Sequence, residues 1–471
     1  MPPSAEPPNR SSQVPERNGG LRPLHGWGRT APTTSYVLPP RSVDELAAAV
    51  ASAGDRGVLA RGLGRSYGDA AQNAGGVVLD MTAMTRIHRI DVDAAEVDVD
   101  AGVSLDTLLR TLFPLGLTLP VQPGTRQVTV GGAVAADVHG KNHHVDGSFG
   151  RHVRSLDLLT ADGELRRLTP DGPDPDLFWA TVGGMGLTGV VVRARFAARR
   201  VETSYVVTHT ERAADLDAVM DRLTAHDTDD ANSDYSVAWF DSVSRGRAMG
   251  RGIVMRGRDA RLEDLPPRLA GRPLGLPPAR TLTTPDVLPS GLVNRASGRL
   301  FNEVWFLHAP RRPVRTVEPA FGFFHPLDSV AEWNRVYGRR GFSQYQLVVP
   351  FGAEDVVRHV VERISATGHV SCLNVLKRFG PGDPAPMSFP APGWTLAVDL
   401  AVRPGLARLL AELDELVAGV GGRVYLAKDS RLSASTAAAM YPRLGEFRSV
   451  LDRVDPKRVF VSDLARRLEV L

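Results

Sequence analysis

Hydrophobic and polar positions alternate along the chain with a period that changes from one segment to the next. Residues 42–57 place apolar side chains at helical spacing, and Ser42 followed by Glu45 three positions later is the capping pattern of a helix start. Residues 58–69 begin as an apolar strand and pass into a glycine-rich turn. The same patterns predict half-buried strands over 75–81 and 86–102, a helix over 104–117, a hairpin turning at Asp162 and Gly163, and a strand over 187–199.

The pattern changes near residue 205 and changes back near residue 423. A Pro/Leu-rich run over 264–293 has no periodicity, and a run of that length inside a compact protein is typical of a mobile lid or binding loop. The final part, 423–471, is predicted to contain a strand, helices and a closing arm. Between the two changes the pattern predicts strands over 235–241, 304–309 and 345–350, and helices over 217–223, 356–364 and 405–422.

Composition places the chain among globular proteins. Its 471 residues are about three times a typical ~150-residue domain. Hydrophobic residues at 43% and charged residues at 23% exclude wholesale disorder. Lys and Arg number 56 against 53 Asp and Glu, with both signs mixed along the chain, which excludes the basic stripe of a nucleic-acid-binding protein. The single cysteine, Cys372, excludes an intramolecular disulfide and a thiolate metal cluster.

The start of the chain shows no signal-peptide pattern. Residues 1–20 are rich in Pro, Ser, Asn and Arg and are predicted to form a disordered tail. No apolar run has the length of a signal peptide or of a membrane span. We therefore expect a protein that is made and folded in the cytoplasm.

Two short motifs suggest functions that their context does not favour. Gly184, Gly186 and Gly189 match the dinucleotide fingerprint, but a helical pattern precedes them and a strand follows, which reverses the required order. The three histidines of HGKNHH (139–144) could suggest a metal, yet no HExxH motif or carboxylate cluster accompanies them. We expect no metal and interpret this segment as a polar, ligand-facing loop, with ordinary surface histidines as the alternative at His143 and His144.

Three separated glycine-rich turns form a stronger pattern. They cover residues 61–69, 123–133 and 181–189, and predicted strands flank them. Backbone amides that converge from such turns can hold a pyrophosphate and leave room for a flat ring system. Ordinary tight turns are the alternative interpretation of the spacing alone.

Ten motifs together carry a resemblance to a known family. With them the chain resembles the FAD-dependent oxidases of the vanillyl-alcohol oxidase type, and is similar to those that act on a polyprenyl-phosphate sugar. The resemblance spans nearly all of the chain after the tail. The motifs are HGWGRTAP (25–32), ARGLGRSYGDAAQN (60–73), PGTRQVTVGGAVAADVHGKNHH (123–144), RSLDLLTADGE (154–164), FWATVGGMGLTG (178–189), FHPLD (324–328), FSQYQLVVP (342–350), SFPAPGW (388–394), AKDSR (427–431) and VSDLARRLE (461–469).

The resemblance implies a two-lobed α+β fold. Its FAD-binding domain is split between residues 21–203 and 423–471, and a substrate-binding domain over 204–422, built on an antiparallel sheet, is inserted between the two parts. Many members of the superfamily tether the flavin through a histidine, and Arg65 stands at that position here, so we expect non-covalent FAD. The implied cofactor-binding residues are Arg61, Gly62, Leu63, Gly64, Arg65, Ser66, Tyr67, Gly124, Thr125, Thr129, Gly131, Gly132, Ala136, His139, Gly140, Asn142, Gly184, Gly189 and Val190.

Oxidising an alcohol also needs an acceptor for the hydroxyl proton. The resemblance points to Lys428 as that acceptor, with His139 as the other catalytic candidate. The alternatives are an exposed Lys428 paired with Asp429 and a packed, backbone-bonded His139. Gln344 and Gln346 are two apart and would share one face of a strand. The implied substrate-binding residues are Lys141, Trp239, Phe324, Gln344, Gln346, Lys377, Thr395 and Ala397. Trp394 is expected to line the pocket with them, and Asp399 and Arg335 are weaker candidates.

Two positions depart from the mycobacterial members of the family. Those members carry a cysteine beside the flavin where this chain has Ala397, so the oxidation should not require a thiol. Phe324 likewise stands where a tyrosine is expected in those members.

The activity implied by the resemblance is FAD-dependent oxidation of the 2'-hydroxyl of decaprenylphosphoryl-β-D-ribose. An NADH-dependent keto-reductase partner would complete the epimerisation to decaprenylphosphoryl-arabinose for cell-wall arabinan. The alternatives are an alditol or aldonolactone oxidase of the same superfamily and a catalytically silent flavoprotein scaffold. We expect association with a membrane surface, on the cytoplasmic side of the inner membrane, with the periplasmic face as the alternative, and no nucleic-acid partner.

Overall fold

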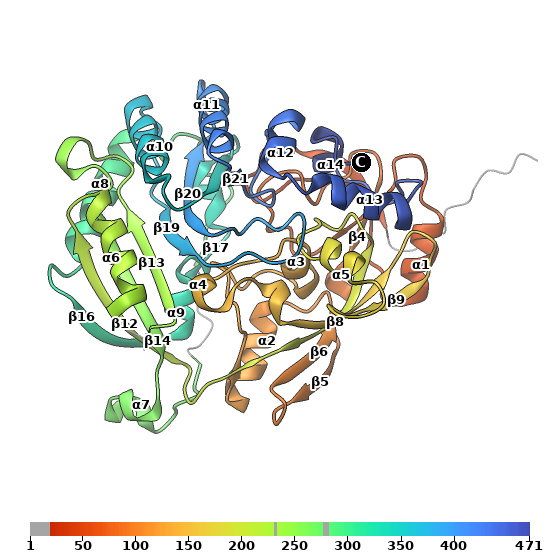
Figure 1. Cartoon of the computed structure of the whole chain (residues 1–471), viewed down its shortest axis with the longest axis horizontal. Coiled ribbons are helices and arrows are strands. Elements are labelled where there is room, and N and C mark those ends of the chain that lie inside the picture. The colour runs from red at the N-terminus through yellow and green to blue at the C-terminus, as the bar shows by residue number, and fades with distance from the viewer. Residues whose placement is uncertain (1–18, 230–232, 277–281) are drawn as a thin grey trace, which may run out of the picture.

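The computed structural model describes residues 19–229, 233–276 and 282–471 (Figure 1). The predicted tail over 1–20 therefore lies almost wholly outside the described residues, and the first strand already begins at Gly20. The chain forms two sheets in its N-terminal part, one large sheet in its middle part, and a group of helices at its C-terminal end that packs back on the N-terminal part (Figure 1).

The first sheet is mostly parallel. Its order is β1-β2-β4-β3, and helix α1 (Val43–Ala51) lies between β2 and β3 in the chain. The predicted N-cap is present, because the Ser42 side chain accepts a hydrogen bond from Glu45 N. Leu46 and Val50 on the helix are buried in one cluster with Val58 and Leu79 of the strands. The strands are β1 (Gly20–Leu24), β2 (Thr33–Leu38), β3 (Val58–Arg61) and β4 (Val77–Asp80).

The second sheet is antiparallel, with the order β5-β6-β10-β8-β9. Its hairpin turns at Asp162 and Gly163, as predicted, with Gly163 at φ +82°. Helix α5 precedes the third glycine-rich turn and strand β10 follows it, which is the order expected from the sequence. The elements are β5 (Ile87–Asp91), β6 (Glu96–Asp100), β8 (Val153–Leu159), β9 (Leu165–Leu168), β10 (Val190–Ala197), α2 (Leu105–Leu112), α3 (Val130–Ala135), α4 (His143–Asp146) and α5 (Pro175–Thr181), with β7 (Leu117–Thr118) paired to β11 (Arg199–Arg200).

The third sheet has eight strands in the order β16-β12-β14-β13-β19-β20-β18-β21, and every pairing in it is antiparallel. All eight strands lie between residues 205 and 424, so the sheet begins one residue after the expected boundary at 204 and extends two residues past the one at 422. The strands are β12 (Tyr205–Ala213), β13 (Tyr235–Phe240), β14 (Gly252–Asp259), β16 (Val314–Pro319), β18 (Phe342–Val349), β19 (Asn374–Phe379), β20 (Gly393–Ala401) and β21 (Arg423–Val424).

Three long helices cover one face of this sheet. Residues with even numbers in β18, such as Gln344 and Gln346, face the opposite side from Tyr345 and Leu347, because strand side chains alternate. Tyr345 and Leu347 join the main hydrophobic core, which leaves the glutamine face free for a cavity. The helices are α6 (Leu216–Asp229), α10 (Glu354–Thr367) and α11 (Leu406–Gly419), and the short α9 (Ala320–Phe324) follows β16.

The C-terminal segment returns to the first sheet (Figure 1). Phe460 forms a parallel bridge with Val58 of β3. Arg467 pairs with Asp69 of the first glycine-rich turn at 2.8 Å and with Asp429 at 2.9 Å. Residues that are about 400 positions apart thus form one unit. The helices of this segment are α12 (Ala434–Met440), α13 (Leu444–Val454) and α14 (Asp463–Arg467).

Two sequence-based predictions fail in the middle part. Residues 304–309, predicted as a strand, belong to helix α8 (Arg295–His308), which Asn294 caps through bonds to Ala296 N and Ser297 N. The run over 264–293 is not wholly irregular, since it contains α7 (Pro267–Ala270) and β15 (Leu282–Thr283), which pairs with β17 (Val330–Ala331). Residues 277–281 of that run lie outside the described residues.

Candidate active site

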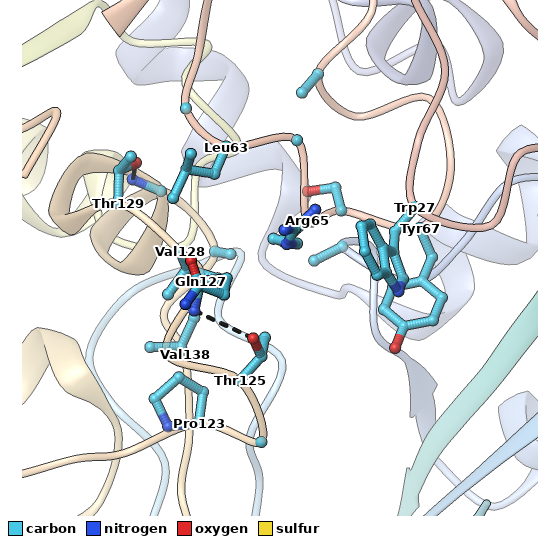
Figure 2. A pocket seen from close by; sticks show the side chains of 18 of the residues that line it. Trp27, Leu63, Arg65, Tyr67, Pro123, Thr125, Gln127, Val128, Thr129 and Val138 are labelled. Carbon is cyan, nitrogen blue, oxygen red and sulfur yellow. Dashed lines mark hydrogen bonds between the residues drawn. The ribbon is translucent and has the colours of Figure 1, made fainter. Parts of the chain in front are cut away.

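A cavity of about 560 Å³ lies between the glycine-rich turns and the glutamine face of the large sheet. Figure 2 shows its N-terminal wall, where Trp27, Arg65 and Tyr67 face Thr125, Gln127 and Thr129 across the open space. The opposite wall comes from alternate residues of three neighbouring strands: Gln344 and Gln346 of β18, Val375 and Lys377 of β19, and Thr395 and Ala397 of β20.

The first glycine-rich turn, residues 61–69, is held in place from both sides. Arg61 donates to Ala71 O at 2.7 Å and to His25 O at 2.9 Å. Gly64 has φ +65°, a backbone conformation that disfavours other residues. A Cβ on Gly68 would lie 1.8 Å from Asp429 O, so only glycine allows this turn to pack against residues 427–431.

The second glycine-rich turn, residues 123–133, ends in helix α3. Thr129 is the N-cap of this helix and accepts from Gly132 N at 3.2 Å. A Cβ on Gly62 would lie 2.2 Å from Thr129 Oγ1, so the first and second turns are in direct contact. Residues of both turns therefore line one end of the cavity beside small side chains, including Ala101, Ala135 and Ala136.

Charged side chains flank this end of the cavity. The Arg65 guanidinium lies 3.9 Å from the centroid of the Trp27 ring (Figure 2). Burial lowers the pKa of Arg65 against the opposing charges of Glu332 and Asp328. Asp328 accepts from Thr125 Oγ1 at 2.7 Å and from Arg126 N at 2.8 Å, so it holds the second turn to the substrate-side segment.

The residues around Lys428 form a buried polar cluster. The Lys428 Nζ lies 3.8 Å from the centroid of the Tyr67 ring. Gln344 Nε2 donates to Asp399 Oδ1 at 2.6 Å and to the Tyr67 hydroxyl at 3.2 Å. Asp399 is fully buried, and its second oxygen has no hydrogen-bond partner among the described residues. Asp429 is turned away from Lys428 toward Arg467, so the alternative of a local Lys428–Asp429 pair does not hold.

Burial shifts the titration of this cluster. It lowers the pKa of Lys428 to about 7, although the negative charge of Asp399 opposes that shift. Burial raises the pKa of Asp399, opposed by the Gln344 hydrogen bond and by Lys428. The Tyr67 hydroxyl has a pKa raised well above its ordinary value by burial, so it stays protonated. A neutral amine is therefore accessible to Lys428 near pH 7.

His139 lies on the same cavity, in an aromatic surround. Its ring centroid is 4.8 Å from that of Phe379 and 5.3 Å from that of Tyr425. Gln346 Nε2 donates to His139 Nε2 at 2.9 Å, which puts the imidazole proton on Nδ1. The Nδ1 atom is buried with no partner among the described residues. Burial, reinforced by Lys377, holds the pKa of His139 well below its ordinary value, so the ring is neutral.

A second lysine completes the basic side of the cavity. Lys377 lies on β19 with its Nζ 5.7 Å from the Phe379 ring centroid, and burial lowers its pKa to about 8. It has no acidic partner among the described residues that would hold its charge. Such a cation can bind an anionic substrate group or a negative charge that develops on a bound cofactor.

The residues that line the cavity fit FAD. Neutral amides of two glycine-rich turns and the Arg65 guanidinium suit phosphate oxygens. The unpartnered, buried His139 Nδ1 is a donor in need of an acceptor, and apolar wall residues such as Val138 and Val191 suit a flat ring. The residues that would hold FAD are therefore those of the two turns together with His139.

The structure brings most of the proposed site residues to this one cavity, and their roles remain predictions. Both catalytic candidates, Lys428 and His139, line it. The cofactor-binding candidates that line it are Arg61, Gly62, Leu63, Gly64, Arg65, Ser66, Tyr67, Gly124, Thr125, Thr129, Gly131, Gly132, Ala136, His139 and Gly189, and the substrate-binding candidates are Gln344, Gln346, Lys377, Thr395 and Ala397.

Four cofactor-binding candidates do not line the cavity. Asn142 donates to Pro120 O and to Asp146, which stabilises the loop behind the wall. A Cβ on Gly140 would lie 2.6 Å from Asn142 Oδ1, and one on Gly184 would lie 2.1 Å from Ala180 O, so both glycines allow tight backbone packing. Val190 packs into the core of the first sheet, whereas its neighbour Val191 lines the cavity.

Three substrate-binding candidates also lie behind the cavity wall. Lys141 donates to Phe323 O, and burial lowers its pKa to about 7. Trp239 donates to Cys372 O at 3.0 Å and packs on Ile253 and Ala309. Phe324 packs against Tyr235 at 4.8 Å between ring centroids. Trp394, which was expected to line the pocket, and the weaker candidates Arg335 and Asp399 do not line it either. Trp394 donates to Glu354, Arg335 donates to Thr284 O, and Asp399 lies one layer deeper.

The histidine-rich loop serves packing as well. His143 is buried, its ring centroid lies 4.4 Å from that of Phe379, and it accepts a hydrogen bond from Gly380 N, so it is not a surface histidine. Among the described residues, no group of three or more His, Cys, Asp or Glu side chains is arranged to hold a metal ion.

Several cavity residues escaped the sequence-based prediction. Trp27 and Asp328 line the cavity and lie in two of the motifs that carry the resemblance, HGWGRTAP and FHPLD. These motifs could have identified them as site residues. Tyr425, which donates to Ala136 O at 2.7 Å, precedes the AKDSR motif by two positions and had no such signal. Glu332 and Trp333 follow strand β17 and line the cavity, where the Trp333 ring lies 5.9 Å from the Trp27 ring between centroids.

Comparison with known proteins agrees with this geometry. A family model described as an FAD binding domain matches residues 34–169, and one described as D-arabinono-1,4-lactone oxidase matches residues 400–468. The decaprenylphosphoryl-β-D-ribose oxidase of Mycolicibacterium smegmatis is 50% identical over 454 residues, which cover 95% of this chain and 97% of the relative.

Two more distant relatives oxidise or dehydrogenate other compounds by name. The L-gulono-1,4-lactone dehydrogenase of Mycobacterium tuberculosis is 24% identical over 92% of this chain and 96% of its own length. The alditol oxidase of a Streptomyces species is 32% identical over 35% of this chain and 39% of its own length. The protein binds FAD, and the cavity between its glycine-rich turns and its large sheet is the site that suits it. The chain belongs to the decaprenylphosphoryl-β-D-ribose oxidase family of FAD-dependent flavoproteins.

Proposed function

We propose that the protein oxidises the 2'-hydroxyl of decaprenylphosphoryl-β-D-ribose to the 2-keto compound, the first half of an epimerisation that yields decaprenylphosphoryl-arabinose for cell-wall arabinan. The observation that carries the proposal is the position of Lys428. Its amine rests on Tyr67 of the first glycine-rich turn and faces the same cavity as Gln344 and Gln346 of the large sheet. A base between a flavin-binding turn and a sugar-binding face suits alcohol oxidation.

The reaction removes two electrons and two protons from a secondary alcohol. The C2–H bond breaks with its electron pair, the O–H bond breaks, and a C=O bond forms. FAD, when bound, supplies the two-electron acceptor. The neutral Lys428 amine accepts the hydroxyl proton, and the carboxyl group of Asp399 stabilises the ammonium that results. Tyr67 keeps its own proton and positions the amine through its ring face.

The remaining polar residues orient the substrate. Gln344 is anchored by Asp399, and Gln346 is anchored by His139 and Thr395, so the two amides are fixed at the strand face where sugar hydroxyls would bind. Lys377 supplies a positive charge without an acidic partner and suits the phosphodiester. The substrate thereby meets donors for its hydroxyls and a cation for its phosphate.

The test is anaerobic reduction of the protein-bound flavin, measured as the loss of its visible absorbance. A soluble short-chain polyprenylphosphoryl ribose should bleach the wild-type protein. Lys428→Met should retain flavin at normal occupancy and slow the bleaching by about 10²–10⁴-fold. Normal bleaching in Lys428→Met would overturn the assignment. A wild-type protein that binds flavin but shows no bleaching with the substrate would favour the alternative of a catalytically silent flavoprotein scaffold.

An alditol or aldonolactone oxidase is the second candidate. The match of residues 400–468 to the lactone-oxidase model supports it, because this segment contains Lys428. Xylitol and L-gulono-1,4-lactone, offered at millimolar concentration, should not reach the rate seen with the polyprenylphosphoryl ribose. If either compound reduced the flavin as fast as the polyprenylphosphoryl ribose does, the second function would replace the first.

The partner and location belong to the proposal as well. We propose that an NADH-dependent keto-reductase takes up the 2-keto product, and that the protein works at a membrane surface, on the cytoplasmic side of the inner membrane, with the periplasmic face as the alternative. Over the described parts of the chain, no helix is long and apolar enough to span a bilayer. Release of the 2-keto product in the absence of a reductase, and its conversion to the arabinose epimer when one is added with NADH, would support the partner.

A further inference from the structure

Helix α8 exposes an apolar stripe that the fold does not use. Leu300, Phe301, Val304, Trp305 and Leu307 are between 47% and 67% exposed. They recur at the i, i+4 and i+7 positions of one side of the helix. The rings of Phe301 and Trp305 stack on the surface at 6.1 Å. These five side chains are called the α8 stripe below.

The other side of α8 is firmly attached to the protein. Asn302 is buried and donates to Asp241 and to Ser371 O. A Cβ on Gly298 would lie 3.1 Å from Val370, so the helix packs closely on the segment that leads into β19. Glu303 pairs with Arg251. The stripe is therefore presented outward by a fixed helix.

The exposed apolar surface of the molecule is concentrated here. Of the 17 large hydrophobic side chains exposed among the described residues, nine lie between positions 282 and 314. Besides the α8 stripe they include Leu282 and Val287, which are 79% and 84% exposed. Scattered single exposures need no explanation, but a contiguous apolar surface marks an interaction site.

Charge on the same segment is mostly positive. Residues 292–315 contain five arginines, at 295, 299, 311, 312 and 315, of which Arg315 pairs with Asp264. The one acidic residue of the segment is Glu303, which Arg251 neutralises. The whole chain, in contrast, has nearly equal numbers of both signs. Trp and Phe on one side of a helix with arginines at its ends are the composition of helices that lie in the interface of an anionic bilayer.

The segment also connects to the rim of the cavity. Strand β15 pairs with β17, and Val330 and Ala331 of β17 line the cavity. Arg340 N donates to Ser290 Oγ, and Arg403 donates to Val293 O, so the chain between β15 and α8 is held along the surface. Helix α8 lies at the end of the molecule opposite α1 and α13 (Figure 1). Residues 284–294 thus connect β15, which pairs with the cavity-lining strand β17, to helix α8.

We propose that α8 inserts its stripe into the surface of an anionic phospholipid bilayer and so presents the cavity rim to a lipid-linked substrate. The proposal deepens the proposed function, on which the identity of that substrate rests. A protein partner is less suited to the stripe, because five side chains on one convex helix expose on the order of a few hundred Å², below the ~800 Å² per partner of a standard protein interface.

The test is flotation of the full-length, FAD-loaded protein with vesicles. Vesicles of phosphatidylcholine with 30% phosphatidylglycerol should bind the wild type at least tenfold more tightly than phosphatidylcholine alone. The double variant Leu300→Glu, Val304→Glu should lose binding to the anionic vesicles by at least tenfold. The matched control is Val145→Glu, Leu165→Glu, which adds the same charge at side chains of similar exposure away from α8 and should bind about threefold weaker at most.

Two further readouts separate the inference from the proposed function. Lipids brominated on their acyl chains should quench wild-type tryptophan fluorescence, and Trp305→Phe should remove most of the quenching. Bleaching of the flavin by the soluble short-chain substrate should be unchanged in the Leu300/Val304 variant, which also shows that it folds. Equal vesicle binding of this variant and the wild type would overturn the inference. It would also be overturned if the wild type bound neither type of vesicle. Loss of bleaching in the wild type would instead count against the proposed function alone.

Discussion

The Lys428 amine lies 3.8 Å from the centroid of the Tyr67 ring, at the point where the last part of the chain meets the first glycine-rich turn. A cation over an aromatic face is stabilised, whereas burial in the same place favours the neutral amine. The balance puts the pKa of Lys428 at about 7, so that the lysine can act as a base near neutral pH.

This balance predicts the pH dependence of flavin reduction. Lys428 accepts a proton only when neutral, so the rate at saturating substrate should rise with pH through about 7 and level off above it. In Asp399→Asn the charge that favours the ammonium is lost, so the pKa of Lys428 falls and the midpoint should move to lower pH. Stopped-flow absorbance from pH 5.5 to 9 measures both profiles. An unchanged midpoint in Asp399→Asn would show that the two groups do not interact.

A steric prediction concerns Gly68. Its added Cβ would lie 1.8 Å from Asp429 O, so Gly68→Ala should push residues 427–431 away from the first turn. Overpacking of this kind costs about 1–3 kcal/mol, and we expect weaker FAD binding and a lower Tm. FAD titration and thermal unfolding measure the two effects. Gly445→Ala is the matched control, because nothing lies within 4 Å of its added Cβ and the helical position should tolerate alanine.

A third prediction uses the alanine at position 397. Ala397 lies on β20 opposite Gln346 and lines the cavity, so Ala397→Cys should place a thiol there. A cavity-directed electrophile should then give one adduct by intact mass. The wild type should not react at the same rate, because burial raises the pKa of Cys372 to about 11. Removing Cys372 in the Ala397→Cys background should leave the adduct in place, and an equal adduct on the wild-type chain would refute the prediction.

The mode of flavin attachment is a fourth prediction. The family resemblance implies that Arg65 stands where many related oxidases carry a tethering histidine, and its guanidinium lies over the Trp27 ring. We therefore expect acid precipitation to release all of the yellow colour into the supernatant. Flavin that stays with the pellet and adds its mass to a peptide would contradict this expectation.

Much of the fold was accessible from local patterns. The cap at Ser42, the hairpin at Asp162 and Gly163, and the reversed order around the third glycine-rich turn all depend on residues close in sequence. Helix α8 was mispredicted because the run VWFLHA has the apolar density of a buried strand, whereas four of its residues, among them Val304 and Trp305, face outward. The sequence of the run itself does not indicate that its apolar side chains are exposed to solvent.

Some residues of the candidate site could likewise be predicted from local sequence, and others could not. Glycine-rich turns and the AKDSR motif identified the residues that carry the chemistry, because each turn requires its glycines locally. Lys141, Trp239 and Phe324 lie just behind the cavity wall, and only the three-dimensional packing separates a lining side chain from one layer deeper. Asp399 carries no local signal for its effect on Lys428, since 28 residues intervene between the two.

The return of the C-terminus to the first sheet has a consequence for biosynthesis. Tyr425, Ala427 and Lys428 complete the cavity, and Arg467 ties their segment to Asp69. During synthesis these residues follow the first two glycine-rich turns by about 300 positions or more. We therefore expect a nascent chain that stops short of residue 425 to lack part of the cavity wall and to bind FAD poorly. A premature stop that removes only α14 should yield a colourless protein, even though every predicted flavin-contacting residue is still encoded.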